Sequence, residues 1–258
     1  MRRWSVILLP GGVVPAGPAY GGLLAELGDA VDARPRDLEV YAGDTPPADY
    51  SLATEAAGIE RTADEAGFER FHLVGYSAGG ASSLAFTLDH PERLLSLALL
   101  EPAFAGWGRM GPEERRHMEG FRAIAELPDA EMMAAFQRAQ IRPGVDLVPP
   151  PPGPPPPWMA KRPAGLRAVL GAFFTSDMDL DALARFDRPV YYALGGRSHP
   201  DYYARMAQRL ATVFPDLTVE VFPERHHFDP PHRIEPARVA ASLRALWSRA
   251  DGEDAPGG

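Results

Sequence analysis

A serine stands between glycines at residues 75–80, where the sequence reads Gly-Tyr-Ser-Ala-Gly-Gly. The apolar run RFHLVG leads into Ser77, and the small-residue run AGGASSLAFTL follows it. When a G-x-S-x-G motif lies between a strand and a helix, its serine sits at the tip of a strained turn. Gly75 and Gly79 suit such a turn, because a Cβ at either position would collide where strand and helix pass closely. Ser77 is therefore the candidate nucleophile.

A serine hydroxyl is a weak nucleophile, so it needs a base within hydrogen-bond reach and a carboxylate that orients the base. The late segment VEVFPERHHFDPPH contains adjacent histidines, His226 and His227, in a predicted loop before the last helix. Either imidazole could accept the proton of the serine, and we take His227, which precedes Phe228, as the first candidate.

The same segment also allows a different interpretation, in which both histidines are metal ligands together with Asp229 and His232. Two prolines, Pro230 and Pro231, exclude the helical presentation of an H-E-x-x-H site. No acidic residue is placed as known zinc motifs require. We therefore expect neither a metal nor another cofactor.

Two acidic residues are candidates for the orienting carboxylate. Glu101 ends the apolar run LLSLALL, and a carboxylate buried there is costly unless it is paired. The alternative is a solvated strand end. Asp201 follows Pro200 and suits the first turn of a helix, where a negative charge meets the positive end of the helix dipole.

The elements that must position these residues follow from the periodicity. Short apolar runs alternate with longer amphipathic stretches, which predicts βαβ units and a mainly parallel sheet flanked by helices. The predicted strands are 4–9, 38–41, 71–75, 95–100, 190–194 and 218–222. The predicted helices are 20–27, 52–66, 78–88, 201–214 and 236–249.

The alternation lapses between residues 102 and 186, which we interpret as an inserted helical lid. Its tract PPPPGPPPP, residues 149–157, predicts a stiff polyproline II spacer of about 3.1 Å per residue, with an SH3-type ligand as the alternative. The remaining residues, 1–101 and 187–250, would form one α/β core. Residues 251–258 would form a frayed tail.

Composition excludes several classes of protein. A net charge of −9 argues against binding to nucleic acid or to an anionic membrane, because both require clustered cations. The chain has no cysteine, so a thiolate nucleophile and a disulfide framework are excluded. The apolar run near the N-terminus is short and suits a strand, and no stretch reaches the roughly 18 apolar residues of a membrane span. We expect a cytoplasmic protein with a small-molecule substrate.

With its strand, GYSAG turn and helix in a βαβ chain, the sequence resembles the α/β-hydrolase family over essentially its whole length. The resemblance implies the chain order serine, acid, histidine, with Ser77 and His227 as nucleophile and base. The family usually carries G-x-x-D after the strand PVYYALGG, but here Ser198 stands in place of the aspartate. Some branches of the family take the acid from the position of Glu101, so we predict Glu101 as the catalytic acid.

An oxyanion hole needs backbone N–H groups directed at the developing negative charge. Ala78 supplies one because it follows the nucleophile. The loop LLPGGVVP resembles the His-Gly loop of the family, with Pro10 in place of the histidine. Gly12 is the first candidate for the second donor, and Val13 is the alternative.

The resemblance implies a serine hydrolase that cleaves an ester or related acyl bond of a small apolar substrate through an acyl-enzyme. Dehalogenases and epoxide hydrolases of this fold use an aspartate nucleophile, so Ser77 argues against both. Carbon–carbon bond hydrolysis, transacylation and cofactor-free lyase or cyclase chemistry remain compatible, as does a non-catalytic ligand-binding receptor. Candidate pocket residues in the predicted lid are Phe104, Trp107, Met132, Met133, Trp158, Phe173 and Phe174.

Overall fold

The computed structural model describes residues 3–147, 149 and 152–253. Its centre is a six-stranded sheet in the order β2-β1-β3-β4-β5-β6, in which each neighbouring pair is parallel. The strands are β1 (Trp4–Leu9), β2 (Val31–Pro35), β3 (Phe71–Tyr76), β4 (Leu94–Leu100), β5 (Val190–Gly195) and β6 (Leu217–Phe222). The predicted α/β class with a mainly parallel sheet is confirmed.

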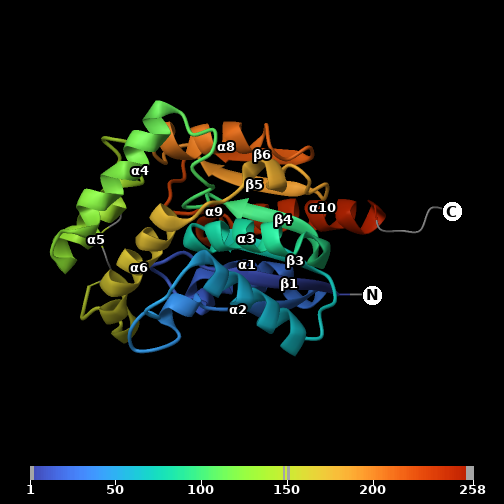
Figure 1. Cartoon of the computed structure of the whole chain (residues 1–258). Helices are drawn as coiled ribbons and strands as arrows, with labels where there is room; N and C mark the ends of the chain where they lie inside the picture. The colour runs from blue at the N-terminus through green and yellow to red at the C-terminus, as the bar shows by residue number, and fades with distance from the viewer. Residues whose placement is uncertain (1–2, 148, 150–151, 254–258) are drawn as a thin grey trace.

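Helices cover both faces of this sheet (Figure 1). On one face, α1 (Ala16–Leu27) and α10 (Pro236–Glu253) pack against each other and against alternate strand residues such as Val74. On the other face, α2 (Leu52–Glu65), α3 (Ala78–Asp89) and α8 (Arg205–Leu210) cover residues such as Leu73. The central strands are therefore buried on both faces, which explains their continuous apolar runs.

The connection between β4 and β5 holds residues 102–186, here called the β4–β5 segment. Its helices are α4 (Pro112–Ala125), α5 (Asp129–Ala139), η4 (Pro157–Lys161), α6 (Arg162–Thr175) and α7 (Leu180–Leu183). In Figure 1, α4, α5 and α6 lie at the end of the sheet opposite the two termini. The carboxyl ends of the strands point toward this end, where active sites of open parallel sheets form. Within the predicted polyproline spacer, residues 150 and 151 lie outside the described part of the chain.

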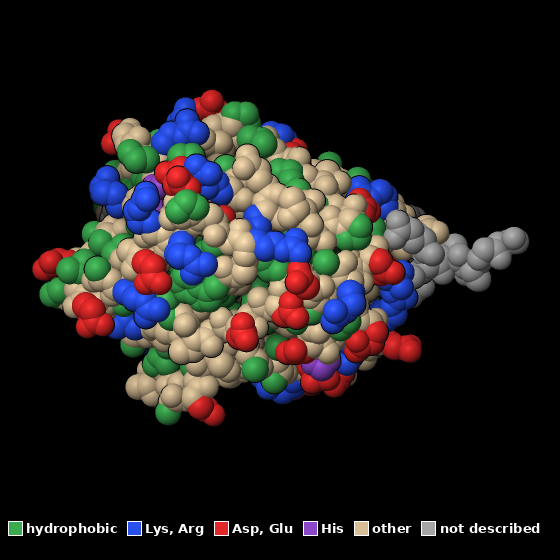
Figure 2. All heavy atoms as spheres, turned by 45° about the horizontal axis from the view of Figure 1, so that its top comes forward, with side chains coloured by type: hydrophobic (Ala, Val, Ile, Leu, Met, Phe, Trp, Pro, Cys, Tyr) green, Lys and Arg blue, Asp and Glu red, His purple; other side chains and the backbone are tan. Residues whose placement is uncertain are grey.

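The surface carries charged side chains of both signs, and Figure 2 shows acidic and basic groups interspersed over the face that it presents.

The short helical turns η1 (Gly28–Ala30) and η3 (Pro91–Arg93) lead into strands, while α9 (Pro231–Ile234) precedes α10. No helix within the described residues combines the length and the apolar character that crossing a bilayer would need.

One predicted strand is wrong. Residues 38–41 form a helical turn, η2 (Glu39–Tyr41), and the backbone N–H of Val40 donates to Glu55 Oε1 on α2 at 3.2 Å. The strand in this part of the chain is β2, which is one of the two edge strands of the sheet. Because an edge strand is only half covered, β2 carries Asp32 and Arg34. It therefore lacks the continuous apolar run from which buried strands are predicted.

Several element boundaries also differ from the prediction, and α1 begins at Ala16, four residues before the predicted start of that helix. The predicted helix 201–214 begins as a π-helical turn, η5 (Pro200–Ala204), and continues as α8 only to Leu210. Helix α10 extends to Glu253 and so includes the first three residues of the expected frayed tail. Residues 254–258 of that tail lie outside the described part of the chain.

Candidate active site

Ser77 occupies the sharp turn between β3 and α3. Its φ of 53° and ψ of −118° are unfavourable for a residue that carries a Cβ. The flanking glycines make this turn possible, because a Cβ at Gly79 would lie 2.5 Å from the carbonyl oxygen of Leu9, and one at Gly75 would lie 2.5 Å from that of Gly79. The predicted reason for both glycines is confirmed.

His227 reaches Ser77 from the loop between β6 and α9. Its Nε2 lies 2.9 Å from Ser77 Oγ. The ring of Tyr203 stacks on the imidazole at a centroid distance of 4.6 Å, and the hydroxyl of Tyr76 donates to the carbonyl oxygen of His227. The position of His227 is thus fixed by a ring stacked on its imidazole and by a hydrogen bond to its backbone carbonyl oxygen.

Glu101 lies directly after β4 and completes a line of three side chains. Its Oε2 lies 3.1 Å from His227 Nδ1, and its Oε1 accepts a hydrogen bond from the N–H of Gly195 at 2.7 Å. An ionised carboxylate only accepts hydrogen bonds, so Nδ1 carries the proton and Nε2 is free to accept from the Ser77 hydroxyl. Exposed fractions of 5% for Ser77, 2% for Glu101 and 1% for His227 place the line out of contact with bulk water.

The alternative acid, Asp201, lies elsewhere. It sits in the first turn of η5, where its carboxylate faces Arg205 at 3.4 Å. Ser198, which replaces the usual aspartate of the family, is buried, but it does not bond His227. The structure therefore brings Glu101 to the histidine and leaves Asp201 at the surface.

Tyrosines surround the carboxylate of Glu101. Burial, followed by the charge of Glu101, raises the pKa of Tyr76, Tyr192 and Tyr203 well above the ordinary value for tyrosine. These phenols stay protonated, and their hydroxyls donate to the carbonyl oxygens of His227 and Tyr203 and to Gln140 Oε1. Burial also lowers the pKa of His226, which favours its neutral form.

The residues of the alternative metal site are engaged in other contacts. His226 Nδ1 accepts the N–H of Phe228 at 3.1 Å, and Asp229 pairs with Arg225 at 2.6 Å. Within residues 3–147, 149 and 152–253, no group of three or more histidine or acidic side chains is arranged to hold a metal ion.

The predicted oxyanion donors lie around a cavity of about 360 Å³. Gly12, Ser77 and Ala78 all line it, whereas Val13 lines an adjoining hollow together with His227. Ala78 is the first residue of α3, so its N–H has no acceptor within the helix. Of the two alternatives for the second donor, Gly12 is the one that shares the main cavity with Ala78.

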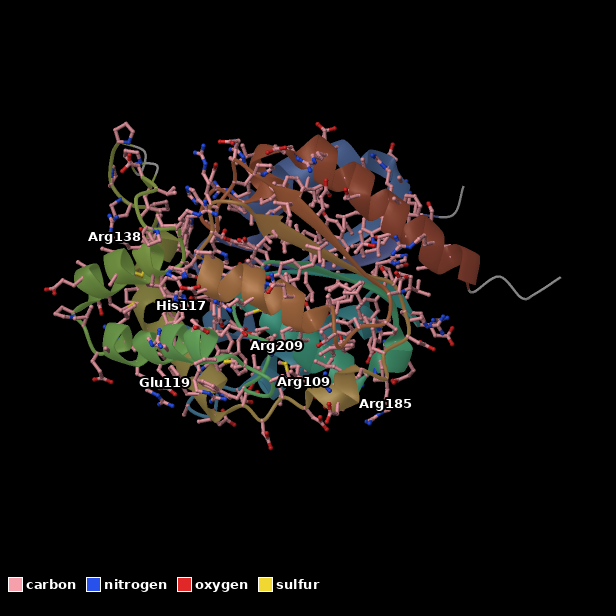
Figure 3. The ribbon with its side chains drawn as sticks, turned by 90° about the horizontal axis from the view of Figure 1, so that it is seen from above. Arg109, His117, Glu119, Arg138, Arg185 and Arg209 are labelled. Carbon is pink, nitrogen blue, oxygen red and sulfur yellow. The ribbon has the colours of Figure 1, made fainter. Side chains whose placement is uncertain are left out.

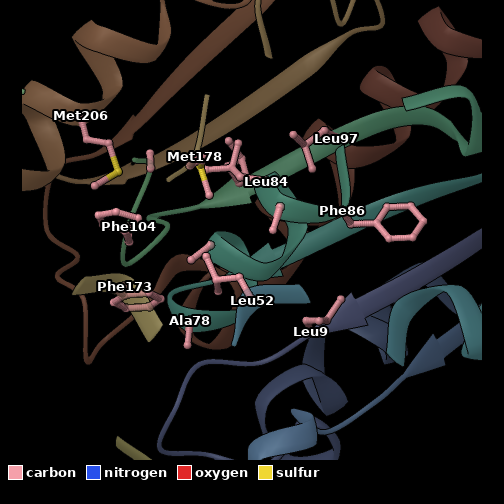
Figure 4. Close-up of a cluster of buried hydrophobic side chains, with 14 of the residues drawn as sticks. Leu9, Leu52, Ala78, Leu84, Phe86, Leu97, Phe104, Phe173, Met178 and Met206 are labelled. Atoms are coloured by element: carbon pink, nitrogen blue, oxygen red, sulfur yellow. The ribbon is translucent and has the colours of Figure 1, made fainter. Parts of the chain in front are cut away.

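The wall of this cavity is apolar and comes mainly from the β4–β5 segment. Its lining side chains from α4, α5 and α6 are Met118, Phe121, Phe136, Leu166, Val169, Leu170 and Phe173. Of the predicted pocket residues, Phe173 lies beside Ala78 and stacks on Phe104 at 5.2 Å (Figure 4). Phe104 and Met132 are buried in the hydrophobic core.

Several site residues had no counterpart among the sequence-based candidates. Tyr76 lies inside the G-x-S-x-G motif, so its place beside Ser77 could have indicated that it belongs to the site. Gln140 and Tyr202 line the cavity, and Tyr203 stacks on His227, but they come from distant segments with no local pattern. Only tertiary packing brings them to the site.

Comparisons with known proteins identify the family of the chain. The model of the alpha/beta hydrolase family matches residues 6–242, and the chain belongs to that family. A solved structure of a hydrolase from Pseudomonas aeruginosa superimposes with a TM-score of 0.70 at 18% identity, covering 95% of this chain and 89% of the other, which supports the fold.

Two curated relatives match shorter stretches. The chain is 41% identical over 71 residues to a fluoroacetate dehalogenase of a Burkholderia species, covering 25% of this chain and 23% of the relative. It is 34% identical over 135 residues to the 2-hydroxy-6-oxo-6-phenylhexa-2,4-dienoate hydrolase of Comamonas testosteroni, covering 48% and 44%. The matches thus span between about a quarter and a half of the length of these relatives.

Proposed function

We propose that the protein is a serine hydrolase that cleaves an ester or related acyl bond of a small apolar substrate through an acyl-enzyme. The observation that carries this proposal is the continuous line of hydrogen bonds from Ser77 Oγ to His227 Nε2 and from His227 Nδ1 to Glu101 Oε2. A hydroxyl, an imidazole and a carboxylate in this order form the arrangement that activates a serine.

In the proposed reaction, His227 Nε2 takes the Ser77 proton as Oγ attacks the substrate carbonyl. Glu101 stabilises the imidazolium that forms, and the N–H groups of Ala78 and Gly12 stabilise the oxyanion. The tetrahedral intermediate then collapses as His227 passes its proton to the leaving group. Water, deprotonated by the same imidazole, attacks the acyl-enzyme and releases the acid and free Ser77.

The lining of the cavity supports the proposed substrate class. The side chains of α4, α5 and α6 offer an acyl group apolar surface beside Ser77. We propose that the β4–β5 segment acts as a lid over this cavity, because it supplies most of the wall. Gln140 and Tyr202 are polar lining residues that can orient the substrate.

The names of the relatives suggest other reactions for this site. A dehalogenase of this fold uses an aspartate nucleophile, which Ser77 does not supply. Hydrolysis of a carbon–carbon bond is compatible with the serine, as are lyase chemistry and simple ligand binding. These alternatives differ from ester hydrolysis in whether an acyl-enzyme forms and turns over.

Turnover of nitrophenyl esters of increasing acyl length tests the proposal. We expect the purified protein to hydrolyse short esters without added metal, with the rate falling once the acyl chain outgrows the cavity. Ser77→Ala should lose activity by at least about three orders of magnitude. Loss of wild-type activity with a chelator, restored by zinc, would contradict the proposal, as would a clear preference for charged or sugar esters.

A further inference from the structure

A second concavity, distinct from the one at Ser77, lies on the outer side of α4 and α5. This groove, here called the basic groove, is lined by α4, α5, residues 141–145 and His199. Its charged or titratable lining residues are Arg116, His117, Arg138, Arg142 and His199. No aspartate or glutamate of the described chain lines it, although the protein as a whole has a net charge of −9.

Two histidines form a pair in the basic groove. The rings of His117 and His199 lie 4.3 Å apart between centroids, and His117 also stacks on Tyr202 at 4.8 Å. His117 Nε2 and His199 Nδ1 are buried, and neither has a hydrogen-bond partner among the described residues. Buried polar atoms of this kind are rarely left unsatisfied, so the histidine pair retains hydrogen-bonding capacity that the described residues do not use.

The arginines around this pair have unused hydrogen-bonding capacity. Within the described residues, the side chains of Arg116 and Arg138 form no hydrogen bond or ion pair, and Arg142 bonds the carbonyl oxygen of Gly196 at 2.6 Å. On α4, Glu119 is already paired with Arg122 at 2.7 Å. Figure 3 shows His117 on α4 and Arg138 on α5 at the same end of the molecule, well away from Arg185.

Both histidines of the pair favour their neutral forms. Burial and the neighbouring His199 lower the pKa of His117 to about 4, with Asp201 acting in the opposite direction. Burial likewise lowers the pKa of His199. A neutral imidazole still carries one N–H donor, and an anion placed between the histidines and arginines would favour the doubly protonated ring.

We propose that the basic groove binds a small molecule that carries phosphate groups. Guanidinium groups match the oxygens of a phosphate with paired hydrogen bonds, and the histidine pair would contact the same group. The groove is recessed between helices, which suits a small ligand. A nucleic acid or an anionic membrane would instead meet the overall negative charge of the chain. The proposal is independent of the chemistry at Ser77.

Calorimetric titration with inorganic pyrophosphate tests this site. We expect saturable binding to the wild type, and binding weaker by about a hundredfold in the double variant Arg116→Ala, Arg138→Ala, because each lost charge-assisted hydrogen bond is worth about tenfold. Both side chains are exposed and unpaired, so the double variant should fold. Arg185→Ala is the matched control, since Arg185 is also exposed and lies outside the groove, and its affinity should equal that of the wild type.

Two further measurements locate the binding. The ring signals of His117 and His199 in NMR spectra should move on titration, whereas Ser77→Ala should bind pyrophosphate as the wild type does. The proposal is wrong if pyrophosphate does not bind, if the double variant binds it unchanged, or if Arg185→Ala weakens it equally. Binding to single-stranded DNA or to phosphatidylglycerol vesicles in preference to pyrophosphate would also overturn it.

Discussion

Ser77 and Glu101 both hold a positive φ, at 53° and 47°, although neither is a glycine. Such backbone conformations cost about 1–3 kcal/mol each and persist only where the surroundings enforce them. Here the N–H of Ser77 bonds the carbonyl oxygen of Leu100 at 3.2 Å, and the N–H of Glu101 bonds that of Ala193 at 3.2 Å. The strain thus falls on two of the three residues proposed for catalysis.

The role of Glu101 can be tested by a change that keeps its shape. Glu101→Gln removes the charge that stabilises the imidazolium and favours the wrong tautomer of His227, so kcat should fall by about three to four orders of magnitude. Circular dichroism should show that the fold is retained. Asp201→Asn should leave kcat nearly unchanged, because that carboxylate only faces Arg205. Essential Asp201 and dispensable Glu101 would reverse the assignment of the acid.

The role of a site residue can be predicted from the sequence where its neighbours in the chain determine that role. The spacing of Gly75, Ser77 and Gly79 predicts the turn, because steric contacts within a few residues set it. Glu101 was predictable because a carboxylate at the end of an apolar strand requires a partner. Tyr203 and Gln140 were not, because their contacts with His227 and the cavity arise only when distant segments pack together.

At the scale of elements, one buried arginine ties the β4–β5 segment to the core. Arg209 on α8 pairs with Glu114 on α4 at 3.2 Å, with side chains only 4% and 3% exposed. The same guanidinium donates to the carbonyl oxygens of Ala105 at 2.8 Å and Gly108 at 3.1 Å. Because α4 contributes to the cavity wall, this contact also fixes the wall relative to the sheet.

Removing Arg209 should therefore destabilise the protein strongly. Arg209→Met leaves the buried carboxylate of Glu114 unpaired, which should lower the free energy of unfolding by about 3–5 kcal/mol in urea denaturation. Adding Glu114→Leu should recover part of this loss, since the buried charge is then absent. Arg205→Ala, at an exposed position on the same helix, should cost less than about 1 kcal/mol. Equal losses of unfolding free energy for Arg209→Met and Arg205→Ala would show that the buried ion pair stabilises the protein no more than an exposed one.

The predictability of elements depended on how fully each is buried. Central strands such as β3 and β4 are covered on both faces, so their apolar runs are continuous and predict them well. The edge strand β2 has the burial pattern of a half-exposed element, so the sequence pattern does not predict it and favours residues 38–41 as a strand. Leu38 and Val40 are apolar because they pack in the core with α2 residues, not because they form a strand.

At the scale of the whole molecule, buried histidines link stability to pH. His232 lies in the core between Tyr20 and Tyr76, at ring distances of 5.1 and 4.7 Å, and both of its ring nitrogens lack a partner within the described residues. Burial lowers its pKa to about 3. The unfolded chain therefore binds a proton at His232 from about pH 6.5 downward, whereas the folded chain does so only near pH 3. Stability is fully present above pH 6.5 and is lost as the pH falls through this range.

Replacing His232 with an apolar ring should remove this dependence. His232→Phe keeps the contacts with the tyrosines and has no titrating group. Relative to the wild type, the variant should gain about 2 kcal/mol of unfolding free energy between about pH 8 and about pH 5. Urea denaturation at both pH values measures the difference, and the other buried histidines cancel because both proteins contain them. Parallel pH profiles for the two proteins would show that His232 does not titrate on unfolding.

The central claim is that Ser77 is a nucleophile activated by His227 and Glu101. Covalent labelling with a fluorophosphonate, followed by peptide mass spectrometry, tests it most directly because the reagent reacts with an activated serine. We expect stoichiometric labelling of the wild type at Ser77, none in Ser77→Ala, and labelling slowed by orders of magnitude in Glu101→Gln. A folded wild-type protein that stays unlabelled, or that is labelled at another residue, would contradict the claim and leave the protein as a binding member of its family.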